Sequence, residues 1–284
     1  MNKSYFITVF ILLLFCQNAY GWDNDVTHPE ISRHAIDGSK NINPYLKNNL
    51  GLQEGIETIL KATVNGKPIN KYSELLSGTI IQYIQEGSFL EDKPLCRTSN
   101  HFHNPRLNWV DSRLKDELWC IDRWCSGGDY PPENIHSAIN WATGYITSES
   151  DGGVKTDTGN EWDWDHAREF FYTYLTGKDN NGEPIAEDKS AREVYLAKSM
   201  QALGHTMHLL QDMAVPAHVR DDSKSHLDFM GITSKNKLHP SEWLGDRLEH
   251  YVKTHSELIT GITDEEIPDI SITKFWDTNL SQNS

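Results

Sequence analysis

The sequence predicts a single compact all-α domain built of several packed helices, and three observations lead to this fold class. Apolar residues recur with helical spacing through most of the chain, whereas few segments alternate between apolar and polar residues as strands do. No internal repeat and no linker divides the chain. Its 284 residues are enough to bury a substantial core.

The expected helices can be followed along the chain by their start and stop signals. The stretch HPEISRHAI predicts a helix because Pro29 and Glu30 are favoured in a first turn. The next helix is expected in YSELLSGTIIQYIQEG and should stop at Gly87. Two more are expected in NIHSAINWATGYI and in WDWDHAREFFYTYLTG, the second ending at Gly177.

The longest expected helix runs from about Asp188 to Met213, and a final helix covers SEWLGDRLEHYVKTHSELI. The stretch TSESDGGVKTDTGN is polar and rich in glycine, which predicts a loop.

The first residues are typical of an export signal. Lys3 supplies a positive start, YFITVFILLLFC an apolar run, and Ala19, Tyr20 and Gly21 a cleavage pattern of the small-residue type. The run is too short to span a bilayer, and no later segment comes close to spanning one. We therefore expect residues 1–21 to be removed, which leaves one secreted or periplasmic domain of residues 22–284 without a transmembrane segment.

The formal net charge of the chain is −15, and removal of Lys3 with the signal would take it to −16. Such a surface repels polyanions, so no specific binding to nucleic acid is expected.

The cysteines predict one small disulfide loop. Cys16 leaves with the signal, and Cys120 and Cys125 in CIDRWC are close enough to bridge in an oxidising compartment. Cys96 is then expected to be unpaired and buried.

Potential metal ligands gather in HTMHLLQDMAVPAH. His208 and Asp212 are four residues apart, so both leave one face of the long helix. Pro216 ends that helix, and His218 follows just beyond it. Two imidazoles and a carboxylate that converge at a helix end are good zinc ligands, while a solvated helix end with a core histidine is the alternative. His205, one turn earlier, fits the core or a supporting contact better than a ligand.

A second set of potential ligands lies in EGSFLEDKPLCRTSNHFHNP. Asp92 and His101 flank a short loop, and they could complete a four-coordinate site with the two residues of the long helix. Glu91 and His103 are the rival ligands in this segment.

A third contribution is expected from the new amino terminus. Cleavage after Gly21 would create a free α-amino group at Trp22, which a bound metal can hold deprotonated. Its nitrogen and the carbonyl oxygen of Trp22 could chelate one ion, and His28 at the head of the next helix could join them.

These residues resemble the zinc-dependent phospholipase C family, which is related to the zinc-dependent single-strand-specific nucleases. The segment W…THPEISRHAI is similar to the family's amino-terminal ligand segment, and EDKPLCRTSNHFHNP to its aspartate–histidine segment. HLLQDMAVPAH is similar to its H-x-x-x-D-x-x-x-x-x-H motif. The resemblance covers most of the mature chain, and the three segments occur in the family's order.

The resemblance implies two or three zinc ions. One ion would be held by Trp22, His28 and Asp212. The second would be held by Asp92, His101, His208 and Asp212, so that Asp212 bridges the two.

A third ion would use His218, a further histidine and Glu249 in RLEHYV. The family places that histidine four residues before the carboxylate, where this chain has Gly245. His226 or His239 must then take its place, and His226 is the favoured choice.

The resemblance also implies hydrolysis of a phosphodiester by a zinc-activated water, with Asp92 as proton acceptor as well as ligand. Asp25 matches an acidic position that the family uses near a choline headgroup. Lys93 and Thr98 stand where the family often has aromatic residues. Lys93 would repel choline and accept an anionic headgroup, or else be an exposed loop lysine.

Three classes of function follow. The first is a phospholipase C that meets glycerophospholipids at a membrane surface and releases diacylglycerol and a phosphorylated headgroup. The second is a secreted zinc nuclease resembling a 3′-nucleotidase, which the acidic charge disfavours. The third is a non-catalytic zinc-binding protein, suggested by the missing histidine before Glu249.

Overall fold

The computed structural model describes residues 26–115, 135–148 and 154–221, together with residues 251–252, 254–255 and 257–260. Over these ranges the chain is mostly helical, which confirms the mainly helical fold class. No helix among them is both long and apolar enough to cross a bilayer.

The helices occur in the following order along the chain. They are α2 (Thr27–Asp37), α3 (Ile42–Asn48), α4 (Ile80–Leu90), α6 (Ala138–Thr143), α7 (Trp164–Thr176), α8 (Lys189–Asp212), α9 (Pro216–Val219) and α12 (Glu257–Thr260). Two 3₁₀ turns, η1 (Gly55–Glu57) and η2 (Leu95–Asn100), follow α3 and α4.

Three small antiparallel strand pairs accompany the helices. β1 (Ile59–Leu60) pairs with β4 (Gly78–Thr79), and β2 (Thr63–Val64) pairs with β3 (Lys67–Pro68). β5 (Tyr145–Ser148) pairs with β6 (Val154–Asp157), with Tyr145 opposite Asp157. The loop predicted for 147–160 is therefore wrong in part, because β-branched Val154 and Thr156 favour a strand there.

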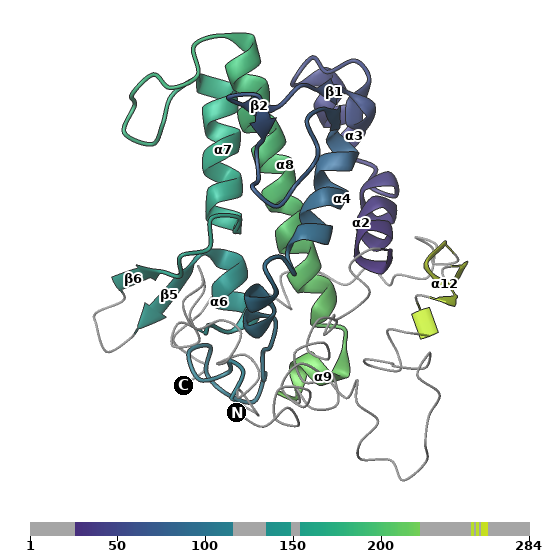
Figure 1. The fold of residues 1–284 in the computed structure, drawn as a ribbon, viewed down its shortest axis with the longest axis vertical. Helices are drawn as coiled ribbons and strands as arrows, with labels where there is room; N and C mark the ends of the chain where they lie inside the picture. The colour runs from purple at the N-terminus through teal and green to yellow at the C-terminus, as the bar shows by residue number, and fades with distance from the viewer. Residues whose placement is uncertain are drawn as a thin grey trace, which may run out of the picture.

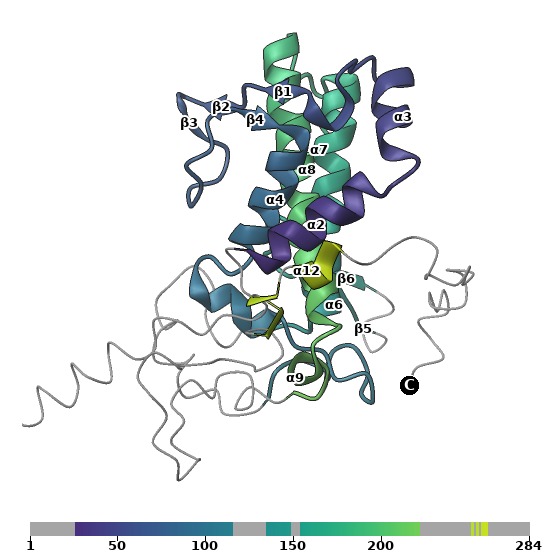
Figure 2. The same ribbon diagram turned by 90° about the vertical axis from the view of Figure 1, so that its right-hand side faces the viewer.

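Helix α8 is the central element of the fold. It packs against α4 on one side and α7 on the other, and α2 packs against α4 (Figure 1). The view turned by 90° shows α2 crossing obliquely beside the α4–α8 pair (Figure 2). The main core lies between these helices and contains Ile36, Leu60, Ile80, Tyr83, Ile84 and Leu196, all at most 4 % exposed.

Two glycines allow α4 and α8 to approach until their backbones touch. A Cβ on Gly204 would collide with the carbonyl of Ile84, and a Cβ on Gly87 would collide with the carbonyl of Gln201. The prediction that the helix stops at Gly87 is therefore wrong. This glycine lies inside α4, where a close approach rather than a helix end requires it.

Capping residues place the ends of α7 and the start of α8 close to their predicted positions. Asp163 and Asp188 accept hydrogen bonds at the starts of α7 and α8, and Gly177 ends α7 with a φ of 75°. At the start of α4, Thr79 and Gln82 form a reciprocal capping box, so this helix begins later than expected.

Cys96 lies in η2 and is disulfide-bonded, which contradicts the prediction of an unpaired cysteine. It is half-buried rather than buried. Spacing along the chain favours a bridge between Cys120 and Cys125. It gives no information about pairings between cysteines that are distant in sequence. The other cysteines, and most of the final predicted helix, lie outside the described residues.

Candidate metal centre

Six predicted ligand side chains meet at the end of α8. His208 and Asp212 come from its last two turns, His218 from α9, and His28 from the first turn of α2. Asp92 follows the end of α4, and His101 follows η2. All six side chains are at most 1 % exposed, so the fold encloses them together.

Asp212 lies at the middle of this group. Its Oδ1 is 3.4 Å from His28 Nε2 and 3.7 Å from His218 Nε2. Its Oδ2 is 2.9 Å from His101 Nδ1 and 3.4 Å from His208 Nε2. One carboxylate that faces four imidazoles is placed as a ligand shared between two ions would be.

Two sets of three side chains each have their ligand atoms within 4.8 Å of one another. One set is His28, His208 and Asp212, and the other is Asp92, His101 and His208. In the second set, Asp92 Oδ1 is 3.5 Å from His101 Nδ1 and 3.7 Å from His208 Nε2. The fold therefore brings together the described residues of both predicted ligand sets.

The fit of a metal ion to these sets can be tested from the polar atoms. Buried polar atoms are normally hydrogen-bonded. Within the described ranges, His28 Nε2, His208 Nε2, Asp212 Oδ1 and both carboxylate oxygens of Asp92 have no hydrogen-bond partner although they are buried, and Asp212 Oδ2 is ion-paired with His101. Cations that bind these atoms would remove the cost of leaving them unsatisfied.

The outer nitrogens of three histidines are held by acceptors. His208 Nδ1 donates to the Ser88 carbonyl (2.6 Å), and His218 Nδ1 donates to the His101 carbonyl (2.9 Å). His28 Nδ1 lies 2.7 Å from Gln211 Oε1, whose amide nitrogen donates to Ser32. A proton on each Nδ1 leaves Nε2 as the ligand atom, which is the arrangement that metal-binding histidines show.

The charges of the site favour a cation at its centre. Burial would lower the pKa of His101, but the carboxylates of Asp212, Glu91 and Asp92 raise it to about 10. Burial also lowers the pKa of His28, and the neighbouring His208 lowers it further. Their rings stack with centroids 3.6 Å apart, and a neutral imidazole is the form that binds a metal.

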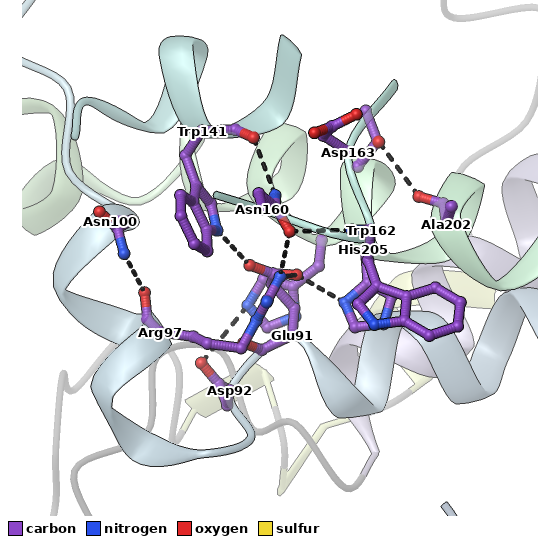
Figure 3. A network of polar contacts seen from close by, with 12 residues as sticks. Glu91, Asp92, Arg97, Asn100, Trp141, Asn160, Trp162, Asp163, Ala202 and His205 are labelled. Atoms are coloured by element: carbon purple, nitrogen blue, oxygen red, sulfur yellow. Dashed lines mark hydrogen bonds and ion pairs between the residues drawn. The ribbon is translucent and has the colours of Figure 1, made fainter. Parts of the chain in front are cut away.

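The rival ligands make other polar contacts. Glu91 accepts hydrogen bonds from Arg97 (2.6 Å) and Trp141 (2.8 Å) (Figure 3). His205 Nδ1 lies 2.5 Å from Glu91 Oε2, and its role in the core or as a supporting residue stays a prediction. His103 Nδ1 instead lies 2.9 Å from the Ser112 hydroxyl.

Most of these supporting contacts are not predicted from the sequence. Ser88, Gln211, Trp141 and Asn160 lie far along the chain from the residues that they support, so no spacing reveals them. Arg97 is only six residues from Glu91, but this spacing alone does not indicate a contact.

No family model, curated protein or solved structure matches this chain.

Several predicted site residues lie outside the described residues, and their roles stay predictions. They are Trp22, Asp25, His226, His239 and Glu249. Lys93 is described and half-buried, with its Nζ 3.5 Å from the centroid of the Phe89 ring. This contact places its charge on an aromatic face and leaves its predicted role in substrate binding untested.

An apolar groove of about 700 Å³ lies apart from the metal centre. Ile36 and Tyr45, Trp164 and Phe171 of α7, and Leu203 of α8 are among the residues that line it. None of the six predicted ligand side chains borders this groove.

Proposed function

We propose that this chain is a zinc-dependent phosphodiesterase of the phospholipase C type. The observation that carries the proposal is the buried group of four histidines around Asp212, in which His28 Nε2, His208 Nε2 and Asp212 Oδ1 have no hydrogen-bond partner among the described residues. A metal centre explains why these costly polar atoms are buried together.

The donor set favours zinc over calcium or magnesium. Imidazole nitrogens dominate it, and carboxylates supply the remainder, whereas calcium and magnesium prefer oxygen ligands. The nearness of the two sets supports two ions that share Asp212, and His218 adds a donor for a third. Trp22, His226 or His239, and Glu249 remain the proposed partners of these ions.

Clustered zinc ions supply an activated water and stabilise the charge that develops on a phosphoryl group. The chain would contribute three things to that chemistry. Asp212 would fix the separation of two ions, and the fixed orientations of His28 and His208 would keep their geometry constant. Asp92, whose two oxygens have no hydrogen-bond partner among the described residues, would accept a proton beside the reacting water.

A second candidate function has an observation in its favour. The six ligand side chains are at most 1 % exposed, as expected for a metal centre that stabilises a fold without catalysis. A non-catalytic zinc-binding protein would hold the same ions and release no product.

The test uses purified protein loaded with zinc. It would be assayed on a phosphatidylcholine analogue, on anionic phospholipids and on single-stranded DNA, before and after treatment with a chelator. We expect chelator-sensitive release of a phosphorylated headgroup from lipid. Cleavage of DNA alone would identify the nuclease, and bound zinc without any cleavage would identify the structural protein.

A further inference from the structure

His101 differs from the other described ligand histidines in the direction its ring faces. His28, His208 and His218 turn Nε2 toward Asp212, while Nδ1 meets an acceptor outside the centre. His101 instead turns Nδ1 toward Asp212 (2.9 Å) and Asp92 (3.5 Å). Its Nε2 must therefore carry the proton if Nδ1 is to bind a metal.

The group that faces this Nε2 is a carboxylate oxygen. Glu91 Oε1 lies 3.6 Å from His101 Nε2, and Nε2 has no hydrogen-bond partner in the described part of the chain. Both side chains are at most 1 % exposed, so water does not compete freely for this position. The separation exceeds a direct hydrogen bond by a few tenths of an ångström, which a small rotation of the ring would close.

The rest of the network fixes Glu91 in this orientation. Arg97 binds its Oε2 (2.6 Å) and its backbone carbonyl (3.1 Å), and Trp141 Nε1 donates to Oε1 (2.8 Å). Asn160 joins the two supporting residues, because its Oδ1 accepts from Arg97 and its amide donates to the Trp141 carbonyl (Figure 3). Glu91 thus cannot swing toward the centre and replace Asp92 without breaking several buried hydrogen bonds.

We propose that Glu91 is the positioning residue for His101: its carboxylate holds the Nε2 proton and thereby keeps Nδ1 facing the ion that Asp92 and His208 share. Carboxylates that support metal-binding histidines in this way typically contribute about ten- to hundredfold in metal affinity. The inference rests on the metal centre of the proposed function and makes no claim about the substrate.

The test compares the zinc affinities of folded variants by competition with a chromophoric chelator. We expect Glu91→Gln to weaken the binding of one ion by about ten- to hundredfold and to leave another tightly bound, because the ion proposed at His28 and Asp212 does not use His101. Substitution of cobalt for zinc should show an altered visible spectrum for the weakened ion.

A matched control separates positioning from loss of stability. Asp163→Asn removes another carboxylate that is 1 % exposed, and this residue caps α7 instead of facing a ligand. It should lower the melting temperature and leave zinc affinity unchanged. Glu91→Asp keeps the charge that Arg97 requires but withdraws the carboxylate from His101, so it should also bind zinc more weakly than the wild type if Glu91→Gln does not fold.

Wild-type affinity and a wild-type cobalt spectrum in a folded Glu91 variant would overturn the proposal, as would a wild-type protein that binds no ion. A wild-type protein that binds zinc but cleaves no phosphodiester would refute the proposed function alone. The affinity comparison would still decide the role of Glu91.

Discussion

At the scale of single residues, Asp212 offers the sharpest test of the metal centre. Its two oxygens face four imidazoles, and an amide at this position would present N–H donors to at least one ion. We expect Asp212→Asn to reduce bound zinc by two ions and any phosphodiesterase activity by about hundredfold or more, since a shared ligand matters more than a supporting group. Elemental analysis and turnover on the same preparation measure both.

The control for this change is Asp111→Asn. Asp111 is an exposed acid beside Lys115 on the surface, so its loss alters the net charge equally but touches no ligand. Full zinc content and normal turnover in Asp212→Asn would contradict a shared carboxylate.

Part of the candidate site could be predicted from the sequence because its residues are close together along the chain. The four-residue step from His208 to Asp212 follows from helix geometry, and His218 follows from a proline that ends the helix. The supporting residues could not be predicted, since Glu91 meets Trp141 and His205 across 50 and 114 positions of sequence. Such contacts depend on how helices pack, which no local pattern records.

At the scale of helices, the crossing of α4 and α8 brings the two halves of the centre together. Ser88 links them, because its hydroxyl donates to the Gly204 carbonyl (3.0 Å) and its own carbonyl accepts from His208. Periodicity predicted both helices, but it could not show that Gly87 and Gly204 mark a close approach.

We predict that Gly204→Ala destabilises the protein by about 1–3 kcal/mol or more, because the added methyl group meets the α4 backbone and the two helices must separate. Zinc affinity should fall as well, since the crossing sets the distance between Asp92 and His208. Chemical denaturation and zinc competition measure the two effects.

Leu210→Ala serves as the control on the same helix. Leu210 is 71 % exposed and contributes little to the core, and alanine favours a helix. Unchanged stability in Gly204→Ala would show that α4 and α8 do not need this close approach.

The start of α7 predicts a pH dependence. The hydrogen bond from His166 to Asp163 (3.0 Å) raises the pKa of His166 above 6.5, although partial burial opposes it. A raised pKa in the folded state means that the pair stabilises the fold fully below the unfolded value and loses this effect as the pH rises through the folded value. His166→Gln should therefore lower the melting temperature more at about pH 5.5 than at about pH 8.5.

Thermal denaturation at the two pH values checks this, with Asp163→Asn as the background. Once the carboxylate of Asp163 is gone, the same histidine change should show a smaller pH dependence, because only the weaker attraction of Glu169 and Asp157 then raises the pKa of His166. An equal loss at both pH values in the wild-type background would argue against a charged His166.

At the scale of the whole molecule, the metal centre joins segments that are distant in sequence. Its described residues come from α2, from the segments that follow α4 and η2, and from α8 and α9, so an ion bound there would connect the beginning of the described chain with its later helices. The chain also has a formal charge of −15, and bound divalent cations would reduce the repulsion among its acidic groups.

We therefore predict that zinc stabilises the folded state and that chelators lower the melting temperature. An ion that binds only the folded chain stabilises it by about 2.7 kcal/mol when its free concentration is a hundred times its dissociation constant. Magnesium at the same concentration should have little effect, because a centre rich in imidazole binds it poorly. Differential scanning calorimetry over a range of zinc concentrations tests this, and Asp212→Asn should remove most of the dependence. A melting temperature that ignores both zinc and chelator would mean that the buried histidines and carboxylates are held together by their own charges, with no ion between them.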